Sequence, residues 1–227
     1  MIPIHGNNPT VLHPIVTVTF IIANVAVFLY ELSLGPRYLD TLINQMGMVP
    51  ASLTQGPAQA SGAFWTPVSS MFLHGGWMHL LGNMLYLWIF GNNIEDSMGH
   101  LRFICFYLIV GLAAAVTHIV LNPTSTVPTI GASGAVSGVL GAYLILFPLA
   151  RIRTLITLGW FIHITYLPAW VLLVVWIGLQ FLSQAMQPMD PNAAGVAYAA
   201  HIGGFVAGLV LILPFRKYRR RAYSRYT

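Results

Sequence analysis

The sequence predicts an all-α membrane protein, a bundle of six transmembrane helices with a short fourth helix, and three observations support this fold class. The chain of 227 residues is 57% hydrophobic and only 7% charged, with a mean hydropathy of +0.74. A soluble domain carries about 25% charged residues, so this chain has too few charges to remain dispersed in water. Apolar segments recur at a length that suits a bilayer, and the basic residues gather on one side of them.

The composition also excludes several kinds of site. The five acidic residues are too few for a carboxylate-rich metal cage, and the single cysteine, Cys105, forms neither an intrachain disulfide nor a thiolate zinc site. Six of the ten basic residues lie in the last twelve positions, after an apolar run. Such a tail is typical of a cytoplasmic anchor on an anionic leaflet. We therefore expect no metal, no cofactor and no nucleic-acid partner, and a lipid bilayer as the surroundings.

Six segments approach the roughly 20 mostly apolar residues that a spanning helix needs. The first is not a cleaved signal sequence, because no Lys or Arg precedes it and it is too long for an h-region. We expect a cytoplasmic segment at 1–14, a membrane domain at 15–214 and a basic cytoplasmic tail at 215–227. The predicted spans are Ile15–Leu34, His74–Ile94, Leu101–Leu121, Gly131–Pro148, Pro168–Met186 and Ala193–Pro214.

The basic residues predict the orientation of these spans. With six spans, both termini lie on one side, together with Arg102, Arg151, Arg153 and the C-terminal cluster, and only Arg37 lies opposite. Basic residues are enriched in cytoplasmic loops, so the side that carries nine of the ten basic residues is the cytoplasm. We expect a multi-pass protein of the plasma (inner) membrane of a prokaryote, with both termini cytoplasmic.

The segment Leu155–Leu167 does not fit this scheme. It is apolar, but Pro168 separates it from the fifth span, and proline disfavours helix in the residue before it. Joined to that span, it would make a helix about 42 Å long against a hydrocarbon core of about 30 Å. We expect an interfacial or re-entrant segment on the cytoplasmic side.

Four polar side chains within the spans are candidates for a functional site, because polar groups in a membrane are costly. His79 and Asn83 are four residues apart in the second span and share one helix face. Ser133 lies in the fourth span and His201 in the sixth.

Small residues favour a close approach of the fourth and sixth spans. Gly134 and Gly138 in one, and Gly204 and Gly208 in the other, recur at helical spacing, and such faces let membrane helices pack closely. This packing would bring the serine of the fourth span towards the histidine of the sixth.

The depths of these residues also agree. If the fourth helix begins at Ser133 and ends before Pro148, it is about 15 residues, or about 22 Å, long. Anchored at the cytoplasmic face, its first residue then lies about 8 Å below the outer surface of the core, comparable with His79 and His201. The gap above a short helix can hold water, and non-helical backbone is tolerated where it lines such a cavity.

These residue types together predict hydrolysis within the bilayer. A serine hydroxyl becomes a nucleophile when a base takes its proton, and histidine is the usual base near neutral pH. Free N–H groups at a helix N-terminus favour negative charge, and Asn83 and His79 can donate to a tetrahedral oxyanion. No acidic residue occurs over 103–189, so we expect a dyad of Ser133 and His201 with no carboxylate behind the histidine.

At these positions the chain resembles the rhomboid intramembrane serine proteases, over about Trp65 to Leu213. The resemblance implies a rhomboid-like bundle, Ser133 as nucleophile, His201 as general base, and an oxyanion site made by the Ser133 N–H, Asn83 and His79. It also implies single-pass or other membrane proteins as substrates. The strings that carry the resemblance are His74-Gly-Gly-Trp-Met-His79-Leu-Leu-Gly-Asn83, Gly131-Ala-Ser133-Gly134 and Ala200-His201-Ile-Gly203-Gly204.

Other residues have simpler interpretations. His74 is expected to line the mouth of the cavity or to cap the second helix. We expect Ser137, where many family members carry an aromatic residue that packs on the catalytic histidine, to bond back to its own helix. His118 and His163 are interpreted as interface or packing residues. The histidines lack the nearby carboxylate or thiolate, or the H-E-x-x-H motif, that would favour zinc.

Two other functions remain open from the sequence. A catalytically inactive relative would bind membrane proteins as an adaptor, although the presence of both Ser133 and His201 disfavours this. A small membrane transporter would more typically show acidic residues or broken helices in both halves. The substrate and the oligomeric state are not determined by the sequence.

Overall fold

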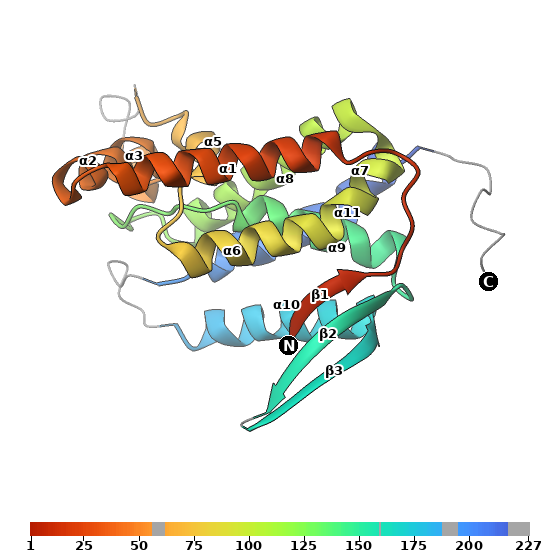
Figure 1. The fold of residues 1–227 in the computed structure, drawn as a ribbon. Coiled ribbons are helices and arrows are strands. Elements are labelled where there is room, and N and C mark those ends of the chain that lie inside the picture. The colour runs from red at the N-terminus through yellow and green to blue at the C-terminus, as the bar shows by residue number, and fades with distance from the viewer. Residues whose placement is uncertain (56–61, 159, 188–194, 218–227) are drawn as a thin grey trace.

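Apolar helices that run alternately in opposite directions form the body of the molecule (Figure 1). The computed structural model describes residues 1–55, 62–158, 160–187 and 195–217. Within these residues, three helices are long and apolar enough to cross a membrane. They are α1 (Ile15–Ser33), α8 (His100–Leu121) and α11 (Tyr198–Phe215), and two shorter apolar helices are α9 (Ser133–Leu146) and α10 (Ala169–Ala185).

The second predicted span, His74–Ile94, is occupied by a continuous run of three helical segments rather than by one regular helix. Four short segments precede it in the long loop after α1. The run consists of α6 (Trp77–Tyr86), the π-helical η2 (Leu87–Gly91) and α7 (Asn92–Met98). The four short segments before it are α2 (Pro36–Met46), α3 (Pro50–Thr54), α5 (Thr66–Ser69) and η1 (Ser70–Phe72).

The helix boundaries follow the sequence predictions closely, except that the second helical run covers 77–98 rather than 74–94 and the last helix begins late. The fourth helix begins at Ser133 and ends at Leu146, so it is short, as predicted. The last helix begins at Tyr198, later than the predicted Ala193, which itself lies outside the described residues. Each predicted span thus coincides with helix, while the number of complete membrane crossings stays a prediction.

The expectation of an all-α fold requires a correction, because the described residues include a three-stranded antiparallel sheet in the order β1-β2-β3. The sheet lies beside the bundle near α10 (Figure 1). The segment predicted to be interfacial or re-entrant forms a β-hairpin, and the N-terminal segment adds the third strand. The strands are β1 (Ile2–Gly6), β2 (Arg151–Leu158) and β3 (Phe161–Pro168).

Alternation along β2 explains why this segment is a strand. Ile152 and Thr154 are completely buried, whereas Arg151 and Arg153 are exposed. Successive side chains of a strand point to opposite faces, so β2 buries one face and exposes its arginines on the other. β-Branched residues, which favour strands, supply the buried positions. Pro168 then ends the hairpin, at the residue before α10 begins.

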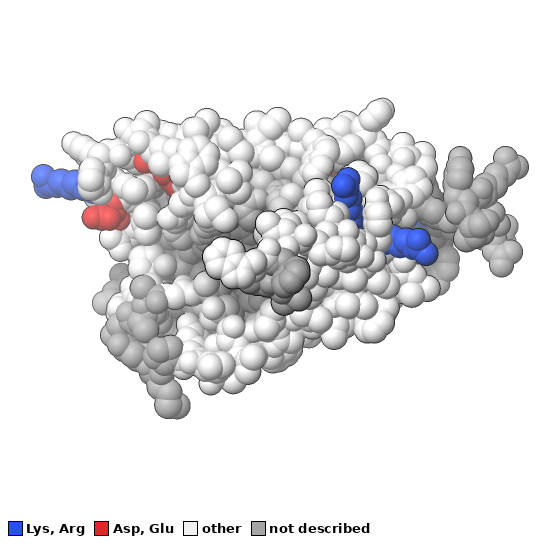
Figure 2. Space-filling view, turned by 60° about the horizontal axis from the view of Figure 1, so that its bottom comes forward, with Lys and Arg blue, Asp and Glu red and all other residues white. Residues whose placement is uncertain are grey.

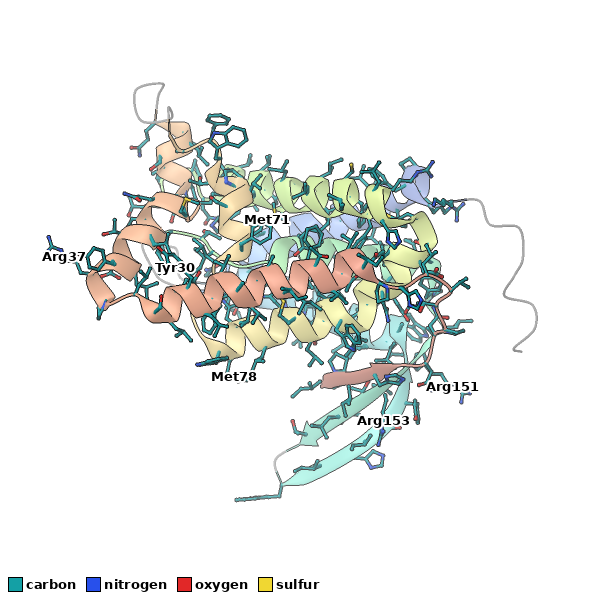
Figure 3. The ribbon with its side chains drawn as sticks, turned by 45° about the horizontal axis from the view of Figure 1, so that its top comes forward. Tyr30, Arg37, Met71, Met78, Arg151 and Arg153 are labelled. Atoms are coloured by element: carbon teal, nitrogen blue, oxygen red, sulfur yellow. The ribbon has the colours of Figure 1, made fainter. Side chains whose placement is uncertain are left out.

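Charged side chains lie towards the ends of the molecule. The face shown in Figure 2 carries almost no Lys, Arg, Asp or Glu along its middle. Arg37, beyond the end of α1, and the pair Arg151 and Arg153 of β2 lie at opposite ends (Figure 3). A middle almost without charges on this face, between ends that carry them, suits a protein whose middle lies in hydrocarbon.

The closest helix contact is between α9 and α11. A Cβ atom added at Gly204 would overlap the carbonyl oxygen of Gly134, and one added at Gly208 would overlap the carbonyl oxygen of Gly138. The two backbones therefore touch at the small-residue faces, and the predicted close pairing of these helices is confirmed. On α9, buried residues run without interruption over 135–143, so this helix lies at the centre of the bundle.

Candidate functional site

A cavity of about 1060 Å³ opens between α6, α9, α10, α11 and the loop that joins α8 to α9. Four predicted site residues contribute to its wall. They are His79 and Asn83 from α6, Ser133 from α9 and His201 from α11. Segments that are far apart in sequence thus supply one chamber with the hydroxyl, imidazole and amide groups that the sequence analysis selected.

Each of the three central residues lies in the first turn of its helix. Ser133 is the first residue of α9, His79 follows closely after the start of α6 at Trp77, and His201 after the start of α11 at Tyr198. In Figure 1, α6, α9 and α11 run in the same direction, so these first turns lie at the same end of the bundle. The first N–H groups of a helix have no intrahelical partner, so this end is favourable for a developing negative charge.

Ser133 and His201 both lie next to the tight contact between α9 and α11. A Cβ atom at Gly134 would lie 3.9 Å from the Cβ atom of Ala200, and these two residues adjoin Ser133 and His201. No hydrogen bond joins the two side chains within the described part of the chain. Both side chains line the same cavity.

A glycine holds His79 next to the serine. Gly131, at a φ of 121°, is placed so that a Cβ atom there would lie 2.5 Å from His79 Nε2 and 3.7 Å from Ser133 Oγ. The backbone N–H of Gly75 donates to His79 Nδ1 at 3.4 Å. Since Nδ1 accepts, the proton of a neutral ring is on Nε2, and His79 presents a donor on the side of the serine.

Asn83 is held by its own helix. Its Nδ2 donates to the carbonyl oxygen of His79 at 3.0 Å, one turn earlier. An amide NH₂ group has two hydrogens, so one remains available to the cavity that Asn83 lines. Both α6 residues can therefore act as hydrogen-bond donors beside Ser133.

Two residues of α10 contact the imidazole of His201. Its Nδ1 lies 2.8 Å from Gln180 Oε1, and the ring of Trp176 lies over it with centroids 5.9 Å apart. The sequence analysis did not identify either residue. A signal for Gln180 was present, since it is an amide inside an apolar span, but the sequence does not show that its helix face meets His201.

The position predicted for His74 requires a correction. His74 does not line the cavity: it is 3% exposed and lies behind His79, with ring centroids 5.1 Å apart. Its backbone N–H donates to the Glu31 carboxylate of α1, at 3.2 and 3.3 Å from the two oxygens. The non-helical 73–76 segment before α6 turns this side chain inward, so His74 supports His79 from outside the cavity.

Two further predictions concern side chains near the cavity. Ser137 Oγ donates to the carbonyl oxygen of Ser133 at 2.6 Å, which confirms that Ser137 bonds back to its own helix. His118, interpreted as a packing residue, lines the cavity and lies 3.1 Å from Thr129 Oγ1 through its Nε2. In the described residues, no three His, Cys, Asp or Glu side chains come together as a metal site.

Comparisons with known proteins show the family to which the chain belongs. The family model of the Rhomboid domain matches residues 61–218. The chain is 34% identical over 150 residues to RHOMBOID-like protein 5 of Arabidopsis thaliana, covering 66% of this chain and 43% of the relative. It is 32% identical over 202 residues to the rhomboid protease GluP of Bacillus subtilis, covering 88% of this chain and 36% of the relative.

A third relative, rhomboid-like protease 5 of Toxoplasma gondii, is 35% identical over 153 residues, which are 66% of this chain and 16% of that protein. The chain therefore spans less than half of the length of each of these three relatives. The region that the family model matches contains the four predicted site residues that line the cavity, namely His79, Asn83, Ser133 and His201.

Proposed function

The chain belongs to the rhomboid family of integral membrane proteins, and we propose that it is an intramembrane serine endopeptidase that cleaves transmembrane segments of other membrane proteins. One observation carries this proposal: a single cavity is lined by Ser133, His201, His79 and Asn83. A hydroxyl, an imidazole and two further donors around one chamber are the groups that acyl transfer requires.

In the proposed reaction, Ser133 Oγ attacks the scissile carbonyl carbon while its proton passes to Nε2 of His201. The tetrahedral oxyanion accepts hydrogen bonds from the Ser133 N–H, from His79 Nε2–H and from the free amide hydrogen of Asn83. The C–N bond then breaks, and His201 gives its proton to the leaving amine. Water hydrolyses the resulting ester on Ser133, with His201 again acting as base.

The surroundings of the cavity support a substrate that is itself a membrane segment. The chamber is bounded by α6 and α10 on two sides, and both belong to apolar segments. We propose single-pass or other membrane proteins as substrates, and a six-span topology with both termini in the cytoplasm of a prokaryotic cell. The positions of Arg37 at one end and of Arg151 and Arg153 at the other support this orientation.

Labelling with a fluorophosphonate probe tests the proposed nucleophile. The purified wild-type protein should be labelled covalently and should cleave a single-pass test substrate with small residues near the outer end of its span. Ser133→Ala should lose both activities. Ser97→Ala is the matched control, because Ser97 Oγ bonds within α7 to the Ile94 carbonyl oxygen at 2.7 Å, outside the cavity, and it should behave as the wild type.

The same experiment separates the other functions. An inactive adaptor or a transporter would leave the wild-type protein unlabelled and the test substrate intact. If Ser133→Ala is labelled at the wild-type rate, the assignment of the nucleophile is wrong. His201 must be neutral to act as a base, so cleavage should also fall towards acid pH.

A further inference from the structure

We propose that Gln180 of α10 is a positioning residue for His201, so that a hydrogen bond from Nδ1 to the amide oxygen holds the general base of the Ser–His dyad in place. This inference rests on the proposed function, because it assigns a role to Gln180 only if His201 is the general base. It concerns a residue outside the motifs that carry the family resemblance, and it adds an amide partner to the predicted dyad, for which no carboxylate was expected.

The geometry sets which end of the Gln180 amide meets the histidine. Gln180 Nε2 donates to the backbone carbonyl oxygen of Trp176, one turn earlier, at 3.3 Å. This bond leaves Oε1 directed at His201 Nδ1, 2.8 Å away. An amide oxygen only accepts hydrogen bonds, so Nδ1 must carry the ring proton.

This tautomer is the one that the proposed mechanism needs. With the proton on Nδ1, Nε2 has the free lone pair that accepts the hydroxyl proton of Ser133. In the other tautomer Nε2 carries the proton and cannot accept one from Ser133. In serine proteases the wrong tautomer lowers kcat by about 10⁴-fold. Since His201 is only 9% exposed, water has little access to replace a lost partner.

Trp176 completes the support from the same helix. It is four residues before Gln180, so the two side chains share one face of α10, and its ring lies over the imidazole at a 34° tilt. The neighbouring indole ring limits the space in which the imidazole can rotate, while the amide of Gln180 holds Nδ1. The sequence carries serine at position 137, so here the aromatic contact comes from α10 instead of α9.

A neutral amide also suits the setting. No acidic residue occurs over 103–189, and a buried carboxylate in an apolar bundle would carry a large desolvation penalty. An amide oxygen accepts the Nδ1–H bond in both protonation states of the ring without adding a charge. Among the described residues, the titratable side chains that interact with His201 are His79 and His118, through their charges, and Tyr198, whose ring centroid lies 6.3 Å away.

Two substitutions at position 180 separate positioning from simple packing. Gln180→Leu keeps the bulk and removes the acceptor, so kcat should fall by about 10- to 100-fold, part of the roughly 10²–10⁴-fold that a general base contributes, with KM within about threefold. Gln180→Glu keeps the acceptor and adds a charge that stabilises the imidazolium. The acid limb of the pH–rate profile should then move up by about one pH unit, while the rate at the alkaline plateau stays within a few-fold of the wild type.

The measurements use the full chain in liposomes, with cleavage of the single-pass test substrate and the rate of fluorophosphonate labelling as readouts. Gln45→Leu is the matched control, because it makes the same chemical change at an exposed position of α2. It should retain the wild-type rate and pH profile. Thermal unfolding in detergent shows whether each variant folds, and if Gln180→Leu does not, the pH shift of Gln180→Glu decides alone.

Each outcome decides the proposal. A loss of kcat in Gln180→Leu together with the shifted acid limb in Gln180→Glu supports it. A folded Gln180→Leu with the wild-type kcat overturns it, and so does an unshifted acid limb in Gln180→Glu, because a carboxylate hydrogen-bonded to Nδ1 would stabilise the imidazolium. If the wild type is neither labelled nor active, the proposed function fails and this inference falls with it. If the wild type is active and both variants match Gln45→Leu, only the role of Gln180 is refuted.

Discussion

The Glu95 carboxylate of α7 accepts two hydrogen bonds from Thr17 in the first turn of α1, one from the backbone N–H at 2.8 Å and one from Oγ1 at 2.7 Å. It also accepts the N–H of Val16 at 2.9 Å and lies 2.6 Å from Nδ1 of His100. The carboxylate is completely buried. It thus caps α1 from another helix, where the first N–H groups have no partner of their own.

Glu95→Ala should therefore destabilise the protein without touching the cavity. It leaves buried N–H groups of α1 unpaired, and we expect the free energy of unfolding to fall by about 3 kcal/mol. Thermal or SDS-induced unfolding in detergent measures this. Glu95→Gln retains an acceptor oxygen and should lose less. The control is Asp40→Ala, which removes an exposed carboxylate of α2, and equal stability of Glu95→Ala and Asp40→Ala would contradict the capping role.

Gly208→Ala should separate α9 from α11. Its new Cβ atom would overlap the carbonyl oxygen of Gly138, and such overpacking costs about 1–3 kcal/mol. Because Ser133 and His201 lie on these two helices, cleavage should fall as well as the unfolding temperature. Gly178→Ala is the control, since nothing lies within 4 Å of a Cβ atom there on α10. A Gly208→Ala protein as stable and active as Gly178→Ala would show that the close approach is dispensable.

Asn83→Ala should lower kcat by about 10²-fold with little change in KM, the usual result of removing one oxyanion donor. Steady-state cleavage of the test substrate in liposomes provides both constants. Asn44→Ala is a matched control, because Asn44 Nδ2 also bonds one turn back, to the Asp40 carbonyl oxygen at 2.8 Å, but on the exposed helix α2. A rise in KM alone would instead indicate a role in substrate binding.

Gly131→Ala should displace His79. The added Cβ atom would lie 2.5 Å from Nε2 and 2.6 Å from Cε1 of that ring, closer than non-bonded atoms approach, so kcat should fall by at least as much as in Asn83→Ala. Gly76→Ala separates this effect from backbone strain, because Gly76 also has a positive φ, of 154°, but open space around its Cβ position. An equal loss of kcat in Gly131→Ala and Gly76→Ala would show that backbone strain, rather than displacement of His79, lowers the rate.

Hydropathy predicted the helices well, because burial in lipid leaves the backbone few alternatives to helix. The paired glycines of α9 and α11 also predicted their contact, since small residues have few other reasons to recur at that spacing. The fourth span was predicted as Gly131–Pro148, and the start at Ser133 that the comparison of depths assumed is the one observed.

The sheet was missed for a physical reason. Its hairpin reads as an apolar run, and periodicity in such a short run does not separate strand from helix. The remaining strand, β1, begins at Ile2, which pairs with Leu155 of β2. This pairing joins residues too far apart in the sequence for local patterns to reveal.

The sequence predicted which residues line the cavity, but not which side chains hold His201 in place. The motifs selected Ser133 and His201, while Gln180 contacts His201 through the rotation of α10 about its axis. That rotation depends on packing against α11, which no pattern within α10 encodes. His74 was misplaced because the turn before α6 directs it behind His79.

The pairing of β1 with β2 has a consequence for biosynthesis. Strand β1 is synthesised before α1, whereas its partner β2 is made only after α1, the α6–α7 segment, α8 and α9. The sheet can therefore close only when these helices have been synthesised, and it then joins the segment before α1 to the segment after α9.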